Sequence, residues 1–216
     1  MSRERCAGRV RKVAIAVVAA VAVAALAARI YWVNTNLPQI PNEYYDQGEW
    51  ASLDGAFQID SQENTNGYSL MVQSAKLMTY DEFVETYRTE DADAAAQPAG
   101  THGDARCVVD VELHIRNEGN SDGVLDAFQM VLVPARGNAY LIADIMNDSA
   151  LWPQTQRGVG MQVHIRPGTE YVAHIPYVFN STENAYLTEV TDTDFTLLVS
   201  RAPVRKMIRV HATGSS

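Results

Sequence analysis

Three histidines, His114, His164 and His174, are the first candidates for chemistry in this 216-residue chain. Each occupies a polar position in a stretch where apolar and polar residues alternate, which is the pattern of a half-buried strand. Three imidazoles on adjacent strands would suit Zn²⁺. The sequence does not show that these strands are neighbours, and no close spacing of His, Cys and Asp supports metal binding. We therefore expect exposed strand histidines and no metal or other cofactor.

A second candidate is the acidic group Asp81, Glu82 and Glu85, whose carboxylates could pair as general acid and base. These residues fall in a segment that is predicted to form a short helix. Thr79 can cap that helix, and acidic residues suit its positive first turn. We expect the three carboxylates on the exposed face of the helix, opposite the apolar face that carries Phe83.

Two pairs of aspartates, Asp91/Asp93 and Asp192/Asp194, offer oxygen ligands of the kind that Ca²⁺ prefers. Neither pair belongs to a 12-residue calcium loop with its later Glu. Residues 88–104 are polar, rich in Ala and Asp, and contain Pro98, so we expect a loop there. The interpretation is therefore a solvated acidic surface.

No motif for nucleophilic catalysis is present, because no Ser lies in a Gly-x-Ser-x-Gly context. Residues 147–149 and 180–182 match the acceptor pattern for N-glycosylation, which we interpret as polar loops. We expect a protein that is not an enzyme.

Two further groups of side chains are clustered along the chain. One cluster of basic residues occurs after the first 33 residues, and there we expect a strand that balances the acidic body; its members are Arg201, Arg205, Lys206 and Arg209. Aromatic residues follow the apolar segment, where we expect interfacial anchoring and packing rather than ligand stacking; they are Tyr31, Trp32, Tyr44, Tyr45 and Trp50.

The elements that must position these groups begin with a basic stub, residues 1–12, and an apolar segment, residues 13–33. As a helix the segment would span about 31 Å at about 1.5 Å per residue, against a hydrocarbon core of about 30 Å. Arg29 would then extend its charge to the headgroups. The basic stub predicts a cytoplasmic N-terminus and an extracellular C-terminal domain. A signal peptide cleaved near Ala27 remains the alternative.

The rest of the chain is acidic. Residues 34–216 contain 25 acidic and 11 basic residues, a net charge of −14. Such a surface argues against nucleic acid as a partner, since a basic face is the usual footprint of nucleic-acid binding. The negative charge does not exclude a protein or a cell-envelope component as a partner of a membrane-anchored domain.

Short strands are predicted throughout this acidic part. The clearest covers residues 107–116, where Cys107, Val109 and Leu113 share an apolar face and Val108 falls on the opposite face, which we expect to meet solvent. Cys107 is thus expected to be a small core residue. Two tight turns are predicted at 54–55 and 167–168. The further strand regions are 49–59, 68–78, 125–134, 140–145, 161–165, 171–179, 195–200 and 204–211. Many short strands separated by turns predict an all-β sandwich or barrel. Pro176 suggests a sheet edge or bulge.

The order of these features resembles a family of exported immunoglobulin-like domains of unknown function from Gram-positive bacteria. The resemblance covers about residues 40–211 and rests on residues 48–49, 67–68, 107–113, 116–121, 167–170 and 178–179. Residues 40–45 with 48–50 resemble an actinobacterial, membrane-anchored branch of that family. The resemblance implies an immunoglobulin-like β-sandwich with one short helix, and it brings no functional residue.

The organisation expected from the sequence is a stub (1–12), a transmembrane anchor or signal peptide (13–33), a spacer (34–48) and an immunoglobulin-like β-sandwich (49–216). The function expected is that of a non-catalytic, membrane-tethered extracellular module which binds a protein or cell-envelope component, or serves as an accessory to an envelope complex. The alternative is a freely secreted binding domain.

Overall fold

The computed structural model describes residues 2–59, 62–87, 107–136, 139–143, 163–180 and 192–214. The chain divides into two compact units, residues 1–39 and 40–216. The predicted loop at residues 88–104, the aspartates Asp91 and Asp93, and the sequon at 147–149 lie outside the described residues, as do residues 181 and 182 of the second sequon.

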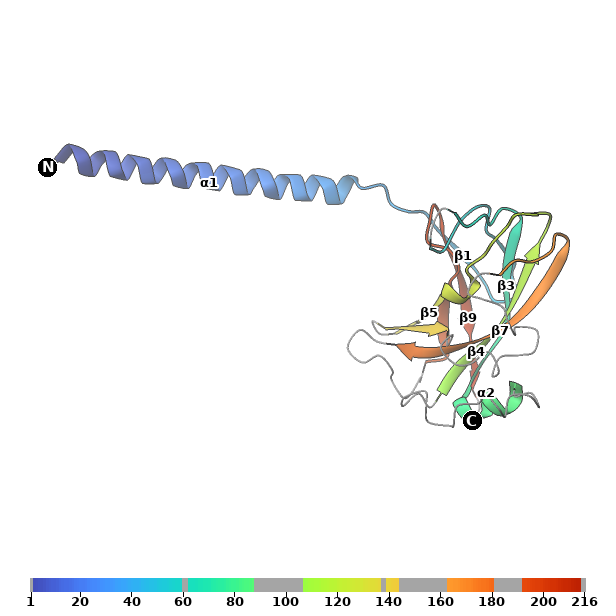
Figure 1. The fold of residues 1–216 in the computed structure, drawn as a ribbon. Coiled ribbons are helices and arrows are strands. Elements are labelled where there is room, and N and C mark those ends of the chain that lie inside the picture. Colours follow the sequence, from blue (N-terminus) through green and yellow to red (C-terminus); the bar gives the residue numbers. More distant parts are fainter. Residues whose placement is uncertain are drawn as a thin grey trace, which may run out of the picture. The chain divides into compact units, whose positions relative to one another are not determined.

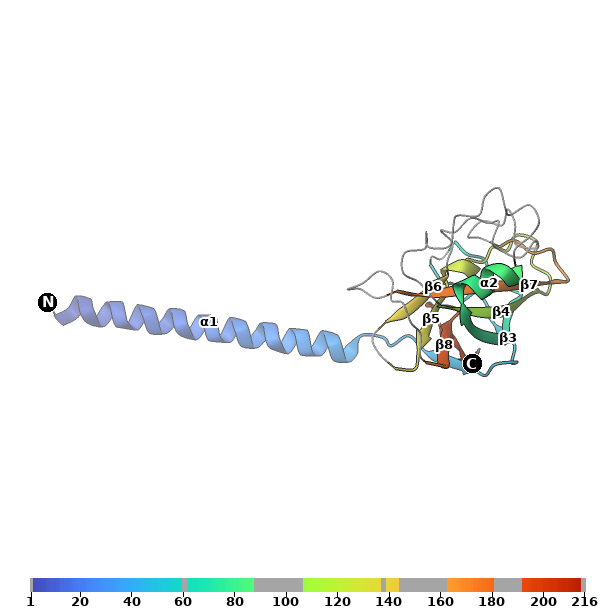
Figure 2. The ribbon, with the colours of Figure 1, turned by 90° about the horizontal axis from the view of Figure 1, so that it is seen from below.

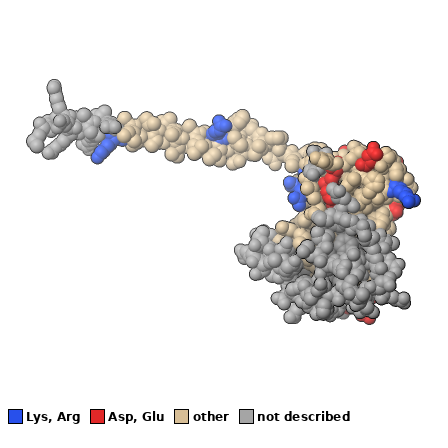
Figure 3. All heavy atoms as spheres, viewed as in Figure 1, with Lys and Arg blue, Asp and Glu red and all other residues tan. Residues whose placement is uncertain are grey.

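The first unit is a single helix, α1 (Ser2–Asn36), which continues beyond the predicted end at residue 33. Its stretch Ala14–Asn36 is long and apolar enough either to cross a membrane or to act as a signal sequence. Arg29 is the one charged residue in that stretch, and Figure 3 shows the described helix surface as mostly uncharged. At the C-terminal end, Thr35 Oγ1 donates to the Tyr31 carbonyl of the preceding turn at 2.9 Å, the usual bond of a threonine inside a helix.

The second unit is built around one ten-stranded sheet (Figure 1). Its strands are β1 (Asn42–Tyr45), β2 (Ala51–Ser52), β3 (Tyr68–Thr79), β4 (Cys107–Asn117), β5 (Val131–Pro134), β6 (Tyr140–Ala143), β7 (Thr169–Asn180), β8 (Asp194–Leu198), β9 (Arg205–His211) and β10 (Thr213–Gly214). Along the sheet they follow the order β1-β9-β8-β5-β6-β7-β4-β3-β10, and β2 pairs with β3. The prediction of a mainly β domain is confirmed.

The sheet is barrel-like, so the expected immunoglobulin-like sandwich of two sheets is not what the structure describes. Two short segments connect the two ends of the strand order, which are the β1–β9 pair and the β3–β10 pair. After β1, which pairs with β9, the Gly48 N–H donates to the Val72 carbonyl of β3 at 2.9 Å. After β9, the chain passes through Ala212 directly into β10, which pairs with β3. Because β1 and β10 are tied to both β9 and β3, the sheet curls on itself.

β1 corrects one predicted boundary. Residues 42–45 were expected to belong to a spacer, but they pair in parallel with residues 205–208 of β9. Sequence patterning gives little signal here, because β1 has only four residues and its side chains are mostly exposed. The connection between the end of α1 and β1 is thus shorter than predicted.

The core is centred on the antiparallel strands β3, β4 and β7. Val109, Leu113 and their neighbours on the predicted apolar face are fully buried, as expected. The opposite face corrects the prediction, because Val108 is 0% exposed and Asp110 is 3% exposed. The Tyr87 hydroxyl reaches Asp110 on this face, so α2 (Tyr80–Tyr87) covers the first part of β4, as Figure 2 also shows. Cys107 is half-buried against the core.

α2 begins as predicted, with a reciprocal capping box. The Glu82 N–H donates to Thr79 Oγ1 at 3.2 Å, and the Thr79 N–H donates to Glu82 Oε2 at 2.8 Å. Phe83 and Tyr87 lie on one face with ring centroids 4.8 Å apart, and Phe83 is buried.

Two predicted turns are confirmed by backbone geometry. Asp54 and Gly55 both have positive φ, at 51° and 80°. At the second turn Gly168 has a φ of 73°, and the Thr169 N–H donates to the Arg166 carbonyl at 3.2 Å, which describes a type II turn with Pro167 leading.

The predicted edge or bulge at Pro176 is wrong. Pro176 stands opposite Asp110 in the β4–β7 ladder, and β7 lies between β4 and β6. The described pairing with β6 starts one residue later, at Tyr177 opposite Ala143. Within the described residues, Pro176 is therefore paired with β4 alone, and a proline is tolerated where its missing N–H is not needed by a neighbouring strand.

Three predicted strand regions form less strand than expected over the residues that the structure describes, which in region 161–165 are residues 163–165. Region 49–59 contains only β2 and an isolated bridge at Phe57, and region 125–134 contains a bridge at Leu125, a short 3₁₀ turn (Ala127–Gln129) and then β5. In region 161–165, Val163 pairs with Leu125 through an isolated bridge. The alternation of buried and exposed residues is nevertheless right, since Val163 is buried and His164 is exposed.

Candidate functional site

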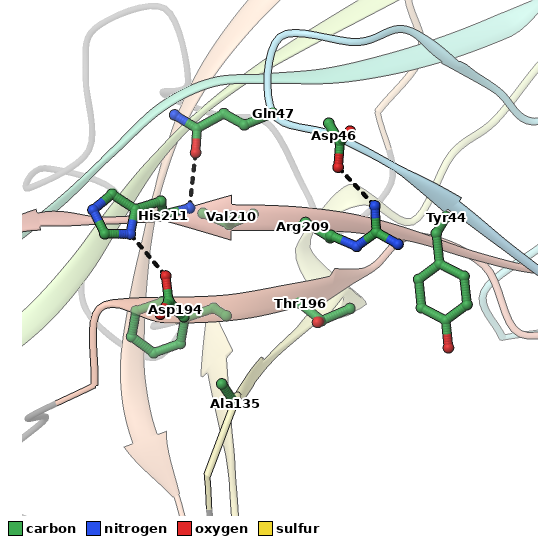
Figure 4. A pocket seen from close by; sticks show the side chains of 10 residues that line it. Tyr44, Asp46, Gln47, Ala135, Asp194, Thr196, Arg209, Val210 and His211 are labelled. Atoms are coloured by element: carbon green, nitrogen blue, oxygen red, sulfur yellow. Dashed lines mark hydrogen bonds and ion pairs between the residues drawn. The ribbon is translucent and has the colours of Figure 1, made fainter.

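A surface groove with a volume of about 500 Å³ lies where β8 and β9 meet β1 and the turn that follows it. We call it the β1–β9 groove. Figure 4 shows Asp46 and Gln47 on one side of β9 and Asp194 and Thr196 of β8 on the other. The residues that line it are Tyr44, Asp46, Gln47, Ala135, Asp194, Phe195, Thr196, Arg209, Val210 and His211.

Arg209 occupies the centre of the groove. Strand alternation places its side chain on the exposed face of β9, while Ile208 and Val210 are buried on the other face. One guanidinium nitrogen lies 2.7 Å from Asp46 Oδ1. The guanidinium carbon lies 5.3 Å from the centre of the Tyr44 ring, within the range of a cation–π contact.

His211 forms a second pair at the other end of the groove. Its Nδ1 lies 2.8 Å from Asp194 Oδ1, and the two residues are directly opposite in the β8–β9 ladder. The His211 backbone N–H donates to Gln47 Oε1 at 2.8 Å. Asp194, which the sequence suggested as a calcium ligand together with Asp192, therefore contacts the imidazole of His211.

Lys206 faces the opposite side of β9 from Arg209. Its Nζ donates to the Ser52 carbonyl at 2.6 Å and lies 3.2 Å from both Glu43 Oε2 and Asp54 Oδ2. Burial lowers the pKa of Lys206, but the hydrogen bonds to Glu43 and Asp54 outweigh burial and raise it overall. The ammonium thus ties β1 and the β2 turn to β9.

The four basic residues that the sequence placed in one cluster have different surroundings in the structure. Lys206 and Arg209 pair with acidic residues of the same domain, which agrees with the charge-balancing interpretation. Arg201 and Arg205 have exposed side chains. Because neighbours along a strand point to opposite faces, the four residues do not form one patch.

A second polar cluster, which we call the polar ladder, crosses β3, β4 and β7. Ser74 Oγ donates to Glu112 Oε2 at 2.7 Å, and Glu112 Oε1 lies 3.1 Å from His114 Nε2. His114 Nδ1 lies 2.7 Å from Glu170 Oε1, and a nitrogen of Arg116 lies 3.3 Å from Glu170 Oε2.

Electrostatics in the polar ladder favours charged groups. Burial lowers the pKa of His114, but the hydrogen bonds to Glu170 and Glu112 outweigh it and raise the pKa above its usual value. The hydrogen bond from Ser74 lowers the pKa of Glu112, and the hydrogen bond to His114 lowers that of Glu170. The ladder is therefore a set of mutually stabilised charges across two strands.

Beside the ladder, Tyr87 of α2 lies between Asp110 and His174. Its hydroxyl donates to Asp110 Oδ2 at 2.6 Å and lies 2.8 Å from His174 Nδ1. Burial and the hydrogen bond to Asp110 raise the pKa of Tyr87. A phenol held protonated in this way is a poor general base, so the arrangement favours a structural role in fixing α2 on the sheet.

The three histidines do not form a zinc site among the residues that the structure describes. His114 and His174 lie on adjacent strands and are half-buried in the networks above, which corrects the expectation that they are exposed. His164 is exposed as expected. Within the described ranges no group of three His, Cys, Asp or Glu side chains is arranged to hold a metal ion.

The remaining candidates have simpler outcomes. Glu82 and Glu85 are exposed on α2, as predicted, and Glu82 also completes the capping box. The side chain of Asp81 lies outside the description. Of the second calcium pair, Asp192 is half-buried and Asp194 contacts His211.

The aromatic residues do not form one stripe. Tyr31 and Trp32 are exposed on α1, in the first unit. In the second unit, Trp50 packs under Arg116, whose guanidinium carbon is 3.9 Å from the ring centre. Tyr45 is half-buried and donates to Glu43 at 2.9 Å. Tyr44 is different, since it is 52% exposed and lines the groove.

Sequence reasoning missed the groove because its parts are far apart in the chain. Gln47 and Asp46 were assigned to a spacer, and Thr196 had no distinguishing feature. Only the pairing of β1 with β9 brings these residues together. The one available signal was the exposed position of Arg209 next to the apolar Ile208 and Val210 in an alternating strand.

The fold and the groove define a barrel-like β domain that follows an apolar helix. The chain belongs to the family described as domain of unknown function (DUF5028), whose model matches residues 42–206. That match begins at the first residue of β1 and ends in β9. Comparison with curated proteins and with solved structures found no match. The expectation of a family of unknown function is therefore confirmed.

Proposed function

We propose that this protein is a non-catalytic binding module, tethered to a membrane by α1, whose β1–β9 groove contacts a protein or a component of the cell envelope. The observation that carries the proposal is the pairing of polar side chains inside the groove. Arg209 pairs with Asp46, and His211 pairs with Asp194. Side chains that are engaged with one another in this way hold a fixed shape, and a groove of fixed shape that combines charged, amide and aromatic side chains suits the binding of a partner.

The tether is supported by the first unit. The stretch Ala14–Asn36 would extend about 34 Å as a helix, against a hydrocarbon core of about 30 Å. Arg29 lies near the C-terminal end of the stretch, from which a long side chain can place its charge among the headgroups. Tyr31 and Trp32 suit the interface itself.

The side of the membrane is proposed from charge. The five basic residues Arg3, Arg5, Arg9, Arg11 and Lys12 precede the apolar stretch and favour a cytoplasmic N-terminus. The β domain would then face outward, as in the exported immunoglobulin-like domains of Gram-positive, actinobacterial bacteria that the sequence resembles. The alternative is cleavage near Ala27, which would release the same domain as a secreted binder.

Fractionation separates these two forms. We expect carbonate washing to leave the protein in the membrane pellet, and protease added to intact cells to remove the β domain. Recovery of the protein from the medium with a new N-terminus near Ala28 would contradict the tether and establish the secreted alternative.

The role of the groove can be tested by photocrosslinking in intact membranes. A photoreactive residue at Thr196, inside the groove, is expected to give a cross-linked adduct. The same residue at the exposed loop position Glu118 serves as the control. Arg209→Glu should abolish the adduct at Thr196, because it places like charges beside Asp46. Equal adducts from both positions, or no adduct from Thr196, would contradict a binding role for this groove.

A further inference from the structure

We propose that the occupant of the β1–β9 groove is a neutral polysaccharide chain. This proposal rests on the proposed function, since it names the chemistry of the component that the groove contacts. It follows from three properties of the groove, which are its internal charge balance, its planar polar side chains and its exposed aromatic ring.

Charge disfavours anionic ligands first. At the centre of the groove Asp46 is paired with Arg209 at 2.7 Å, so this pair carries little net charge. Residues 34–216 as a whole carry −14, which repels anionic polymers at long range. A ligand that carries many hydroxyl groups and no charge avoids this repulsion and can hydrogen-bond to the paired side chains.

Planar polar groups provide the hydrogen bonds that such a ligand needs. A carboxylate, an amide and a guanidinium line the groove from Asp46, Gln47 and Arg209, with Asp46 and Arg209 pointing toward each other and Gln47 pointing toward the backbone of His211 (Figure 4). The carboxylate and the guanidinium each present polar atoms side by side, which matches the spacing of neighbouring hydroxyls on a sugar ring. The Gln47 amide accepts from the His211 N–H and donates to the Gln73 carbonyl at 3.4 Å, which fixes its orientation and leaves one N–H and one lone pair for a ligand. Because one Asp46 oxygen is occupied by Arg209, the pair offers an acceptor and several N–H donors from a fixed position.

The third property is the Tyr44 ring. It is 52% exposed, although Arg209 lies over it, so ring surface stays open to solvent. Aromatic rings combine a large apolar face with low conformational freedom, and the C–H face of a sugar can pack on such a surface. A groove of about 500 Å³ falls in the range of small-ligand clefts, about 300–1,000 Å³, and it is open to solvent rather than enclosed, so a chain can lie in it.

The test uses the full-length chain in a detergent without sugar headgroups and measures binding by calorimetry. The probes are short neutral oligosaccharides of glucose, galactose or mannose, with an oligomer of galacturonic acid as the charged counterpart. We expect at least one neutral series to bind, and the acidic oligomer to bind more than about tenfold more weakly. Tyr44→Ala and Gln47→Ala should each weaken binding by about tenfold or more. Arg205→Ala, an exposed change on the same strand outside the groove, should leave it unchanged.

Two results would overturn the proposal. One is the absence of binding to every neutral series by wild-type protein, and the other is binding that Tyr44→Ala and Gln47→Ala leave intact while circular dichroism shows that both variants are folded. Either result, combined with the photocrosslinked adduct at Thr196, would leave the groove as a contact surface for a protein. Loss of the adduct as well would remove the proposed function itself.

Discussion

At the scale of single residues, the charged groups of this domain stabilise one another. Lys206 bridges two carboxylates, Arg209 pairs with Asp46, and His114 lies between two glutamates. These contacts are short, but most partners are partly exposed, so each contributes modestly to stability. Their main consequence is positional, because each charge fixes the side chain of a neighbouring strand.

The first prediction concerns the pH dependence that His114 imposes. Its pKa is raised in the folded state, so its stabilisation is complete below about pH 6.5, the usual value for histidine, and is lost as the pH rises through the folded pKa. His114→Gln should therefore flatten the decline in the free energy of unfolding above about pH 6.5. Denaturant titrations across this range measure it.

The control for that experiment is His164→Gln, which changes an exposed histidine. It should reproduce the pH dependence of the wild type. At low pH, both variants are expected to lose free energy of unfolding. The hydrogen bond from Ser74 lowers the pKa of Glu112, so the stabilisation from this carboxylate disappears as the pH falls below about 4.3. If the free energy of unfolding of His114→Gln declines above about pH 6.5 as steeply as that of the wild type, the polar ladder is not the source of the decline.

At the scale of elements, α2 decides which positions of β4 are buried. The helix rests on the face that carries Val108 and Asp110, and Tyr87 donates to Asp110 through the sheet-facing side of the helix. Further along β4, beyond this cover, Glu112 and His114 are only half-buried. One strand thus has two buried faces at its start and one at its end.

The second prediction follows from that burial. Val108→Asp and Val109→Asp should both unfold the domain, because each places a carboxylate in a fully buried site at a cost of several kcal/mol, against a total stability of about 5–15 kcal/mol. Val133→Asp, at an exposed β5 position, is the matched control and should be mild. Thermal melting of the three variants provides the comparison. A stable Val108→Asp variant would show that α2 does not cover β4.

The third prediction concerns the start of α2. Thr79→Ala removes the side-chain half of the capping box and should lower the free energy of unfolding by about 0.5–2 kcal/mol. Thr86→Ala makes the same substitution within the helix, where Thr86 Oγ1 only donates back to the Glu82 carbonyl, and should have a smaller effect. Equal losses in urea titrations would mean that the cap contributes nothing specific.

At the scale of the whole β domain, the sheet closes through short segments near β9. Lys206 binds the β2 turn and β1 at once, and Gln47 holds the backbone of His211. These contacts join residues up to 164 positions apart. Closure and the groove therefore depend on the same few contacts.

The fourth prediction tests this closure. Lys206→Met keeps the apolar stem and removes three hydrogen-bonding contacts of the ammonium, so we expect a loss of about 1–3 kcal/mol in the free energy of unfolding. Arg205→Met changes the exposed neighbour and should have little effect. Guanidinium titrations distinguish the two. A Lys206→Met variant as stable as the wild type would show that backbone pairing and packing tie β1 to β9 without the ammonium.

The sequence by itself determined the features that depend on near neighbours. The capping box at Thr79 and Glu82 joins residues three positions apart, and the turn at Pro167 and Gly168 depends on the backbone freedom of one glycine. The apolar helix follows from an unbroken apolar run, and the inward face of β4 follows from the alternation of apolar and polar residues. These interactions are local, so residue type and spacing suffice to predict them.

Only the tertiary structure decided the rest, because it depends on which distant segments meet. β1 forms a strand where β9 accepts it in parallel, and α2 packs on the second face of β4, where Val108 and Asp110 are buried. The groove likewise exists only where the β1 turn meets β8 and β9. The energy of such contacts comes from groups far apart in sequence, and no local pattern of residues records which of them will be neighbours.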